Sequence, residues 1–560
     1  MENNENLEMM ENTVSEENSP ENEVAEEKYV FSLGESVYAW LCIVAGFFFC
    51  KVGTAGNHPL GALIFLIALF GVTAIWLWRS GIKLNRASII VVATAAVSAV
   101  SVVITSNAFV QFIAWMYCLA AYCMFVYTAT GNSLMGGLSN YIGADLIRAV
   151  AVLPMSCLSY IFEAAFAGKK GRGTNAAGKI IVGLLMAVVP SAVVLILLSY
   201  DNDFMSIIRS VFDFSFNNIF SNLLCLVFGV PVAMYLFGMF MAGRQHTCAE
   251  VLSAEKWNDM ARTARILPAA TAVASVLPIL SLYVIFFISQ WKYYISGFAG
   301  VLPDEYSYTN YAREGFFQLC AVACINFLII ASVTLAIRRG SKFGGIALKA
   351  ISIVFAVCTL VLISTAIAKM VMYIKFYGLT HKRVYASWFM LLLAVLCGII
   401  IAKQFSKRLK FILVSAVVCV AMFLGLAVSN VDSFIAKYNV DRYLDGTLHS
   451  VDVSAMLELG DSAVPHMVRL ADEMNANNID PSLEFLVGNT VVPDLYTRCR
   501  AYLFYMEANM DEDIFSATLP GIRARAALDK AGIEWEDLTY EQQEKVCLFL
   551  GRGGAFSWDY

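Results

Sequence analysis

Apolar runs of about twenty residues recur along this chain between residues 36 and 429. The run between Lys349 and Lys369 is typical, because nineteen uncharged residues separate the two lysines. As a helix these residues rise about 28 Å, close to the ~30 Å hydrocarbon core of a bilayer. Repeated runs of this kind leave no polar face for water, and 59% of the chain is hydrophobic. The sequence therefore predicts an all-α, polytopic membrane protein and excludes a soluble globule.

The predicted spans divide the chain into three parts. Residues 1–30 hold ten acids and one lysine and are predicted to be a disordered acidic tail. Residues 31–429 are predicted to be a transmembrane helical domain, and residues 430–560, with 22 acids and ten bases, a small soluble helical domain. We expect eleven transmembrane helices, at residues 36–50, 59–78, 88–105, 108–128, 178–198, 220–243, 268–291, 315–337, 346–374, 384–402 and 409–429.

The distribution of basic residues predicts the orientation in the cell membrane. With a cytoplasmic N-terminus, nineteen Lys and Arg residues of the membrane domain fall in inner loops and seven in outer loops, as the positive-inside rule requires. The C-terminal domain is then external. Residues 149–168 are long enough to cross, but a crossing would invert every later loop against its charge. We therefore expect a surface or re-entrant stretch kinked at Pro154, and a second surface stretch at residues 201–219.

Two alternatives remain open for the prolines of the later spans. Pro190, Pro231, Pro268 and Pro278 interrupt spans five to seven. Broken helices of this kind form substrate sites in transporters, whereas single prolines are also simply tolerated in spans because neighbouring groups bind the freed carbonyl. We favour simple tolerance.

No local motif predicts an enzyme, a cofactor or a metal. The five histidines are scattered, and most of the fourteen cysteines lie in apolar spans, where cysteine behaves as a small hydrophobe. The stretch from Gly173 to Lys179 matches GxxxxGK, but Ile180 follows it and cannot bind magnesium. Cys499 and Cys547 are the only cysteines of the C-terminal domain, and their spacing alone does not decide whether they form a disulfide. Nothing indicates a nucleic-acid partner.

The residues with the strongest claim to a function lie in loops predicted to be external. Tyr311 and Glu314 share one helix face, Lys369 and Tyr373 share another, and a polar hairpin joins the ninth span to the tenth. An ordinary aromatic belt with a snorkelling lysine would also give this pattern. Three bases beside one acid nevertheless favour an anion-binding cluster. Its predicted members are Tyr311, Arg313, Glu314, Lys369, Tyr373, Tyr377, Arg383 and Tyr385.

Four stretches carry a family resemblance. They are YAREGFFQL at 311–319, YGLTHKRVYASWF at 377–389, NVDSFIAKYNVDRY at 430–443 and DSAVPHMVRL at 461–470. Over about residues 305–470 the chain resembles the domain-of-unknown-function family 4173, bacterial multi-spanning membrane proteins, and its relative 4153. No established activity accompanies that family, so the resemblance implies fold and location and supplies no catalytic residue.

Two functions compete on this sequence. The first is transport or handling of an anionic small molecule or envelope lipid precursor through an outward-facing site. The alternative is a membrane-anchored sensor or scaffold whose external C-terminal domain binds a protein partner. An integral-membrane transferase is the weakest hypothesis, because no acid–base or metal constellation is visible. Membrane lipids are expected partners in every case.

Overall fold

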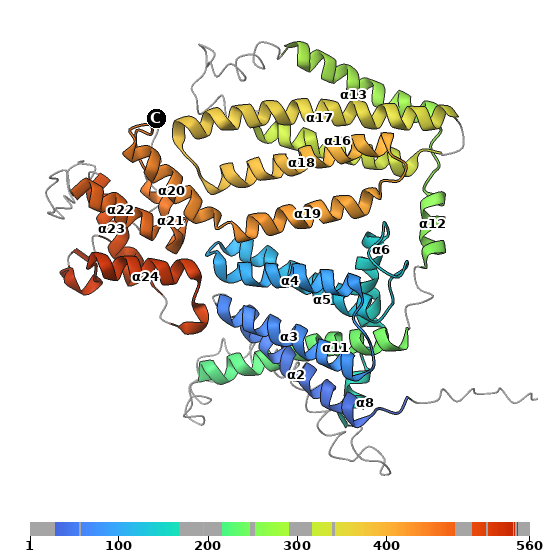
Figure 1. Cartoon of the computed structure of the whole chain (residues 1–560), viewed down its shortest axis with the longest axis horizontal. Coiled ribbons are helices and arrows are strands. Elements are labelled where there is room, and N and C mark those ends of the chain that lie inside the picture. The colour runs from blue at the N-terminus through green and yellow to red at the C-terminus, as the bar shows by residue number, and fades with distance from the viewer. Residues whose placement is uncertain are drawn as a thin grey trace, which may run out of the picture.

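The fold was established in a computed structural model (Figure 1). It describes residues 29–54, 58–166, 216–246, 253–289, 316–338, 342–475, 495–510 and 513–540, together with residues 194, 542, 543 and 546. Every regular element in these ranges is a helix, and the β-type contact found there is an isolated bridge between Leu267 and Ile337. The all-α prediction is confirmed.

Ten of the described helices are long and apolar enough to cross a membrane, which confirms a multi-pass membrane protein. They are α2 (Leu33–Thr54), α3 (Pro59–Arg79), α4 (Arg86–Ile104), α5 (Ala108–Ala129), α11 (Phe216–Gln245), α13 (Ala269–Ser289), α16 (Phe316–Ala336), α17 (Lys342–Tyr377), α18 (His381–Phe405) and α19 (Phe411–Val428). They correspond to ten of the eleven predicted spans. Helices α11 and α13 continue through Pro231 and Pro278.

Several predictions fall on residues that the structure does not describe. The fifth predicted span, 178–198, lies outside the described residues except for Val194. Also outside the described residues are residues 1–28, the loop from Gly173 to Lys179, residues 201–215 and Cys547. Cys499 is buried in the core of the C-terminal helices. The span count therefore stays a prediction, and the pairing of Cys499 with Cys547, which the sequence does not decide, is not tested.

Helices α2 and α11 form an antiparallel pair that needs two glycines. At one end Arg244 donates to Glu35 at 2.6 Å, and at the other Lys51 donates to Asn222 at 2.9 Å. Between these contacts, a Cβ on Gly229 would lie 2.7 Å from the carbonyl carbon of Gly46, so a larger residue does not fit. Small residues allow such close approach of transmembrane helices.

The stretch that the sequence predicts to be re-entrant is a broken helix. A helix runs through α6 (Ile142–Ile147), a π-helical turn (Arg148–Val152) and α7 (Leu153–Met155), and α8 (Tyr160–Phe166) follows after a turn. Pro154 has no N–H to give to the carbonyl of Val150, which accepts a hydrogen bond from Tyr235 at 2.7 Å instead. Within the described residues 142–166, no piece is long enough to span a bilayer.

The spans form two groups on either side of α19. One group contains α2, α3, α4, α5 and α11, and the other contains α13, α16, α17 and α18 (Figure 1). Helix α19 contacts both groups, through α4 and α18. On the side of the first group, the ring of Phe423 in α19 lies 5.9 Å from that of Tyr117 in α5.

The C-terminal domain lies at one end of both groups (Figure 1). Its helices pack around a common core that includes Met467, Leu470, Tyr502 and Phe504. Its elements are α20 (Val431–Leu444), α21 (Val453–Leu457), η2 (Gly460–Ser462), α22 (Val464–Asn475), α23 (Leu495–Ala508), η3 (Ile514–Ser516), α24 (Leu519–Ala531) and η4 (Trp535–Asp537).

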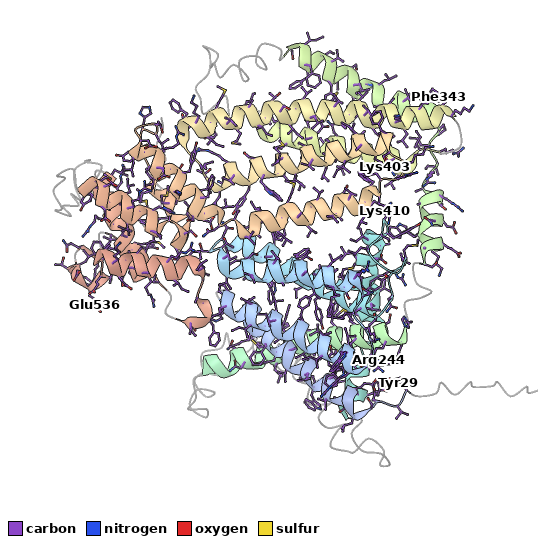
Figure 2. All side chains as sticks on the ribbon, in the orientation of Figure 1. Tyr29, Arg244, Phe343, Lys403, Lys410 and Glu536 are labelled. Atoms are coloured by element: carbon purple, nitrogen blue, oxygen red, sulfur yellow. The ribbon has the colours of Figure 1, made fainter. Side chains whose placement is uncertain are left out.

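The two ends of the molecule differ in charge. Arg244, Lys403 and Lys410 lie at the end opposite Glu536 of the C-terminal domain (Figure 2). The amphipathic helix α12 (Ala254–Thr263) lies at that opposite end as well (Figure 1). Loops that the positive-inside rule assigns to the cytoplasm thus gather at one end, here called the basic end, and the other is called the domain end. Which end faces the cytoplasm stays a prediction.

Candidate functional site

The hairpin between α17 and α18 is held by a side chain of the C-terminal domain. Asn439 in α20 accepts a hydrogen bond from the backbone N–H of Leu379 at 2.7 Å and donates to the carbonyl of the same residue at 2.8 Å. Gly378 has a φ of 76°, and a Cβ there would lie 2.5 Å from Oδ1 of Asn439. The tight turn and the close contact both require glycine at this position.

Arg442, one turn beyond Asn439, binds the end of α17. Its guanidinium donates to the carbonyls of Ile374 at 3.2 Å and Lys375 at 2.9 Å, and to the carbonyl of Thr447 at 2.7 Å. Carbonyls at a helix C-terminus have no partner within the helix, and a cation is favourable there. Asn439 and Arg442 lie three residues apart, so one face of α20 covers the hairpin.

Three of the eight predicted site residues come together at this hairpin. The guanidinium carbon of Arg383 lies 4.1 Å from the ring centroid of Tyr373 and 6.0 Å from that of Tyr377, and the two rings meet edge-on at 5.1 Å. One nitrogen of Arg383 also donates to the carbonyls of Tyr377 at 3.0 Å and Gly378 at 2.5 Å. Arg383 therefore already stabilises the turn, in addition to stacking on an aromatic face.

The other predicted residues take different places. Lys369 lies one turn before Tyr373 on α17 and is half-buried. Tyr385 stacks on His381 with parallel rings 5.8 Å apart, and its buried hydroxyl has no hydrogen-bond partner among the described residues. Tyr311, Arg313 and Glu314 lie outside the described residues. The anion-binding role of the eight residues stays a prediction.

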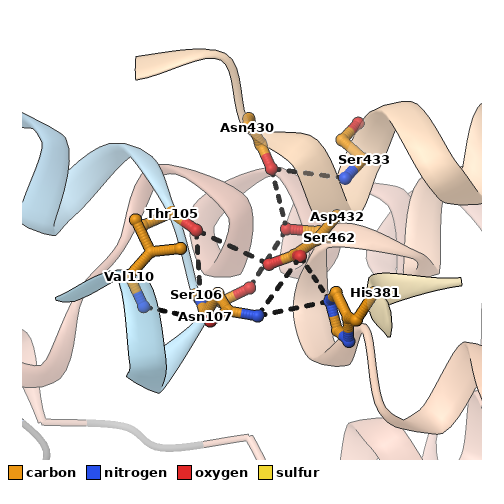
Figure 3. Close-up of polar contacts among 9 residues, drawn as sticks. All are labelled: Thr105, Ser106, Asn107, Val110, His381, Asn430, Asp432, Ser433 and Ser462. Atoms are coloured by element: carbon orange, nitrogen blue, oxygen red, sulfur yellow. Dashed lines mark hydrogen bonds and ion pairs between the residues drawn. The ribbon is translucent and has the colours of Figure 1, made fainter. Parts of the chain in front are cut away.

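A buried carboxylate joins the hairpin between α17 and α18 to the group of spans that contains α4 and α5 (Figure 3). Asp432, in the first turn of α20, is 1% exposed, and its Oδ1 lies 2.5 Å from Nε2 of His381. Thr105 donates to Oδ2 at 3.5 Å, and the amide of Asn107 donates to Oδ1 at 3.5 Å. Thr105 and Asn107 belong to the turn between α4 and α5. The carboxylate thus contacts both groups of membrane helices, and a buried charge needs such partners.

The turn that leads into α20 extends this network, here called the Asp432 cluster. Asn430 has a φ of 42° and caps α20, with its Oδ1 accepting from the N–H of Ser433 at 3.3 Å. The same oxygen accepts from the Ser462 hydroxyl at 3.2 Å, and that hydroxyl lies 3.0 Å from the hydroxyl of Ser106. The members of the cluster are Thr105, Ser106, Asn107, His381, Asn430, Asp432, Ser433 and Ser462.

A second contact joins the C-terminal domain to the first group of spans. Nδ1 of His58, the residue before α3, lies 3.3 Å from a carboxylate oxygen of Asp513 and 3.2 Å from the hydroxyl of Ser516. Both partners flank or belong to η3. The domain therefore bridges the two groups of spans at the domain end, through α20 and through η3.

Two titratable groups in the domain are perturbed by their surroundings. Burial raises the pKa of the Asp461 carboxyl above its ordinary value. Burial, assisted by the positive charge of Arg469, lowers the pKa of His466, whose Nε2 lies 3.0 Å from the Ser433 hydroxyl. Among the described residues no group of three or more His, Cys, Asp or Glu side chains is placed to hold a metal ion.

The sequence prediction of the site missed the Asp432 cluster. Its members lie in four separate segments. Three of these segments, at residues 105–107, 381 and 430–433, stand at the end of an apolar run on the side predicted to be external. Polar residues that share a predicted membrane side are candidates for one another's partners, and this signal could have identified Thr105, Asn107, His381 and Asp432 together. Three of the four motif stretches quoted above, 377–389, 430–443 and 461–470, contact one another here.

The family comparison agrees with this geometry. A model described as a domain of unknown function (DUF4153) matches residues 92–470, more than half of the chain, and this range contains the whole Asp432 cluster. Of the two related families that the motifs resemble, the match is thus to 4153. No curated protein and no solved structure matches the chain. The chain is therefore a member of the DUF4153 family and an integral membrane protein with the C-terminal helices fastened to the ends of its spans.

Proposed function

We propose that this protein is a membrane-anchored sensor or scaffold, whose C-terminal domain binds a partner and transmits that binding to the spans. The observation that carries the proposal is the position of Asp432. Its carboxylate accepts hydrogen bonds from the turn between α4 and α5 and contacts His381 at the start of α18. A domain attached only by its chain would need no such bridge.

The physical argument rests on the cost of breaking a buried polar network. A network of this kind is favourable when every member is paired and costly when one is withdrawn, so it has few intermediate arrangements. Movement of α20 must either carry both groups of spans with it or break the contacts of Asp432, Asn439 and Arg442. Binding energy at the domain can therefore change how the groups are held together.

The hairpin offers a test with a matched control. Gly378→Ala places a Cβ against Asn439, whereas Gly81, with a similar φ of 80°, has nothing within 4 Å of its Cβ position. Both substitutions impose the same backbone strain, and only the first pushes α20 away. We expect Gly378→Ala to increase hydrogen exchange in the turn at residues 105–107, which is distant in the sequence, and Gly81→Ala to leave that turn unchanged. Exchange that increases only in the hairpin itself would refute the coupling.

The partner can be sought from the exposed end of the domain. A photo-crosslinking amino acid at Glu536 in intact cells should give a discrete protein adduct. The adduct should weaken when Gly378→Ala is introduced, because the domain is then displaced. If position 536 yields no adduct above that of an uncrosslinked sample, the domain has no partner and the sensor or scaffold function is wrong.

A second function is favoured by one specific observation at the half-buried Arg383, the edge of its guanidinium that does not bind the turn. One of its nitrogens is bound to carbonyls, and no hydrogen bond from its other nitrogens is found among the described residues. With Tyr373 below it and Lys369 one turn away, this edge suits a phosphate or carboxylate, so we also propose that the hairpin handles an anionic lipid or acidic precursor.

The anionic site is tested by a substitution that keeps the charge. Arg383→Lys removes the planar fork and should weaken co-purification of anionic lipid, measured by native mass spectrometry. Lys382→Ala, an exposed neighbour, should leave it unchanged. Equal lipid retention in Arg383→Lys and the parent would show that Arg383 serves only the turn.

A further inference from the structure

Large apolar side chains are exposed in one short part of the C-terminal domain. Ile514 is 69% exposed and Phe515 is 51% exposed in η3, and Ile522 in the first turn of α24 is 60% exposed. These three residues are here called the apolar knuckle. The domain around them is acidic and packs most of its other large apolar residues into a core, with Phe434 and Tyr540 exposed elsewhere in the domain. Single exposed apolar residues are common, but three within nine residues need an explanation.

The position of the knuckle is fixed by the start of α3. His58 holds Asp513 and Ser516 on either side of the knuckle's first two residues, through contacts of 3.3 Å and 3.2 Å. A Cβ on Gly61 would lie 3.9 Å from the Cβ of Phe515. Phe515 therefore lies level with the third residue of α3. Figure 1 shows α24 beside the ends of α3 and α4 that lie at the domain end of the molecule.

The length of α3 indicates the depth at which Phe515 lies in the membrane. Helix α3 has 21 residues and rises about 31 Å, which matches the ~30 Å hydrocarbon core. Its first turn must then lie where the headgroups meet the acyl chains. Ile64 and Ile67, further along α3, are 51% and 63% exposed and form part of the surface that faces lipid. The knuckle continues this apolar surface at the boundary.

We propose that the apolar knuckle inserts into the headgroup region at the domain end, and that lipid of the same bilayer covers Ile514 and Phe515. Aromatic and aliphatic side chains are stabilised at this depth. Asp513, the acid that precedes Ile514 in the sequence, is bound to His58 and does not have to enter the lipid. Arg523, exposed beside Ile522, is placed to meet headgroup phosphates. The domain thereby acquires an attachment to the membrane that does not depend on the Asp432 cluster and lies beyond the family match at residues 92–470.

Photo-crosslinking in lipid nanodiscs tests this directly. The full-length protein is reconstituted in nanodiscs of phosphatidylcholine and phosphatidylglycerol, with a benzophenone amino acid at position 515. The control carries it at Glu536, which is exposed and lies at the far end of the same domain (Figure 2). We expect at least tenfold more lipid adduct at 515 than at 536, measured by mass spectrometry. Equal yields at both positions, or a protein adduct at 515 in intact cells, would overturn the proposal.

A second variant separates insertion from mere proximity. Ile514→Asp, added to the 515 probe, places a carboxylate at the boundary and should reduce the lipid adduct at least threefold, because a charge resists leaving water. Tyr540→Asp, at an aromatic of the same domain that is 83% exposed, is the matched control and should leave the yield unchanged. An unchanged yield in Ile514→Asp would also overturn insertion. Neither result depends on whether the domain binds a protein partner, so this proposal and the sensor or scaffold function fail separately.

Discussion

Among single residues, Asp432 and Arg383 show how polar groups are used at the domain end. Arg383 lies within one hairpin and contacts residues no more than ten positions away in the sequence. Asp432 contacts Thr105, which is 327 positions away, and His381, which is 51 positions away. Arg383 therefore stabilises a local turn, whereas Asp432 holds distant parts of the chain together.

Removing the Asp432 side chain should be strongly destabilising. Asp432→Ala leaves His381, Thr105 and Asn107 without their buried acceptor, and we expect a loss of about 3 kcal/mol. Asp432→Asn keeps one acceptor oxygen and should cost less. Glu458→Ala, at an exposed position of the same domain, should change little. Thermal unfolding in one detergent, followed by tryptophan fluorescence, measures all three. A melting temperature in Asp432→Ala equal to that of the parent would contradict the structural role of the cluster.

The perturbed carboxyl of Asp461 gives a prediction about pH. Because burial raises its pKa, the folded protein holds the proton at pH values where the unfolded chain has lost it, from the ordinary 3.8 up to the raised value. Its contribution to stability therefore falls as the pH rises through that interval. We expect Asp461→Asn to raise the melting temperature at pH 7 and to change it little at pH 4. Glu458→Gln is the exposed control, and a lower melting temperature of Asp461→Asn at pH 7 would contradict burial as the cause.

At the scale of helices, the close pair of α2 and α11 depends on residues without side chains. Gly229→Ala forces a Cβ against the backbone of Gly46, which cannot rotate away, and we expect a loss of about 3 kcal/mol. Gly71→Ala, within α3 and with nothing within 4 Å, should be neutral or stabilise by up to about 1 kcal/mol. Thermal unfolding of both variants in the same detergent is the measurement. Equal melting temperatures would show that the two helices can separate at no cost.

The sequence was sufficient to predict most helices, and the reason is physical. A bilayer requires each crossing to satisfy its own backbone over about twenty apolar residues, so every span leaves a run that can be read locally. Lys369 and Tyr373 were placed on one helix face by the same local periodicity, and both lie on α17. The partners of Asp432 were not predictable in this way, because contacts between segments hundreds of residues apart leave no periodic pattern in one sequence. The break in the helix at Ser156 was partly predictable, because the nearby Pro154 is a local signal in the sequence.

For the whole molecule, the separation of charge predicts its orientation. Glu536 lies at the domain end and α12 at the basic end. A cysteine replacing Glu536 should react with a membrane-impermeant maleimide in intact cells, and one replacing Lys256 only after permeabilisation. The parent protein gives the background of the native cysteines. The reverse pattern would invert the orientation, and labelling of both positions in intact cells would show that the count of crossings between them is wrong.

Helix α17 has 36 residues and is about 54 Å long, which exceeds the ~30 Å hydrocarbon core by about 24 Å. In mechanical terms it is a stiff lever. At the domain end Arg442 binds its last carbonyls, and nearer its other end Lys349 lies over the ring of Phe405 of α18, 4.6 Å from the centroid. We therefore expect a tilt imposed on the C-terminal domain to be delivered, by this one helix, as a sideways displacement on the opposite face of the membrane.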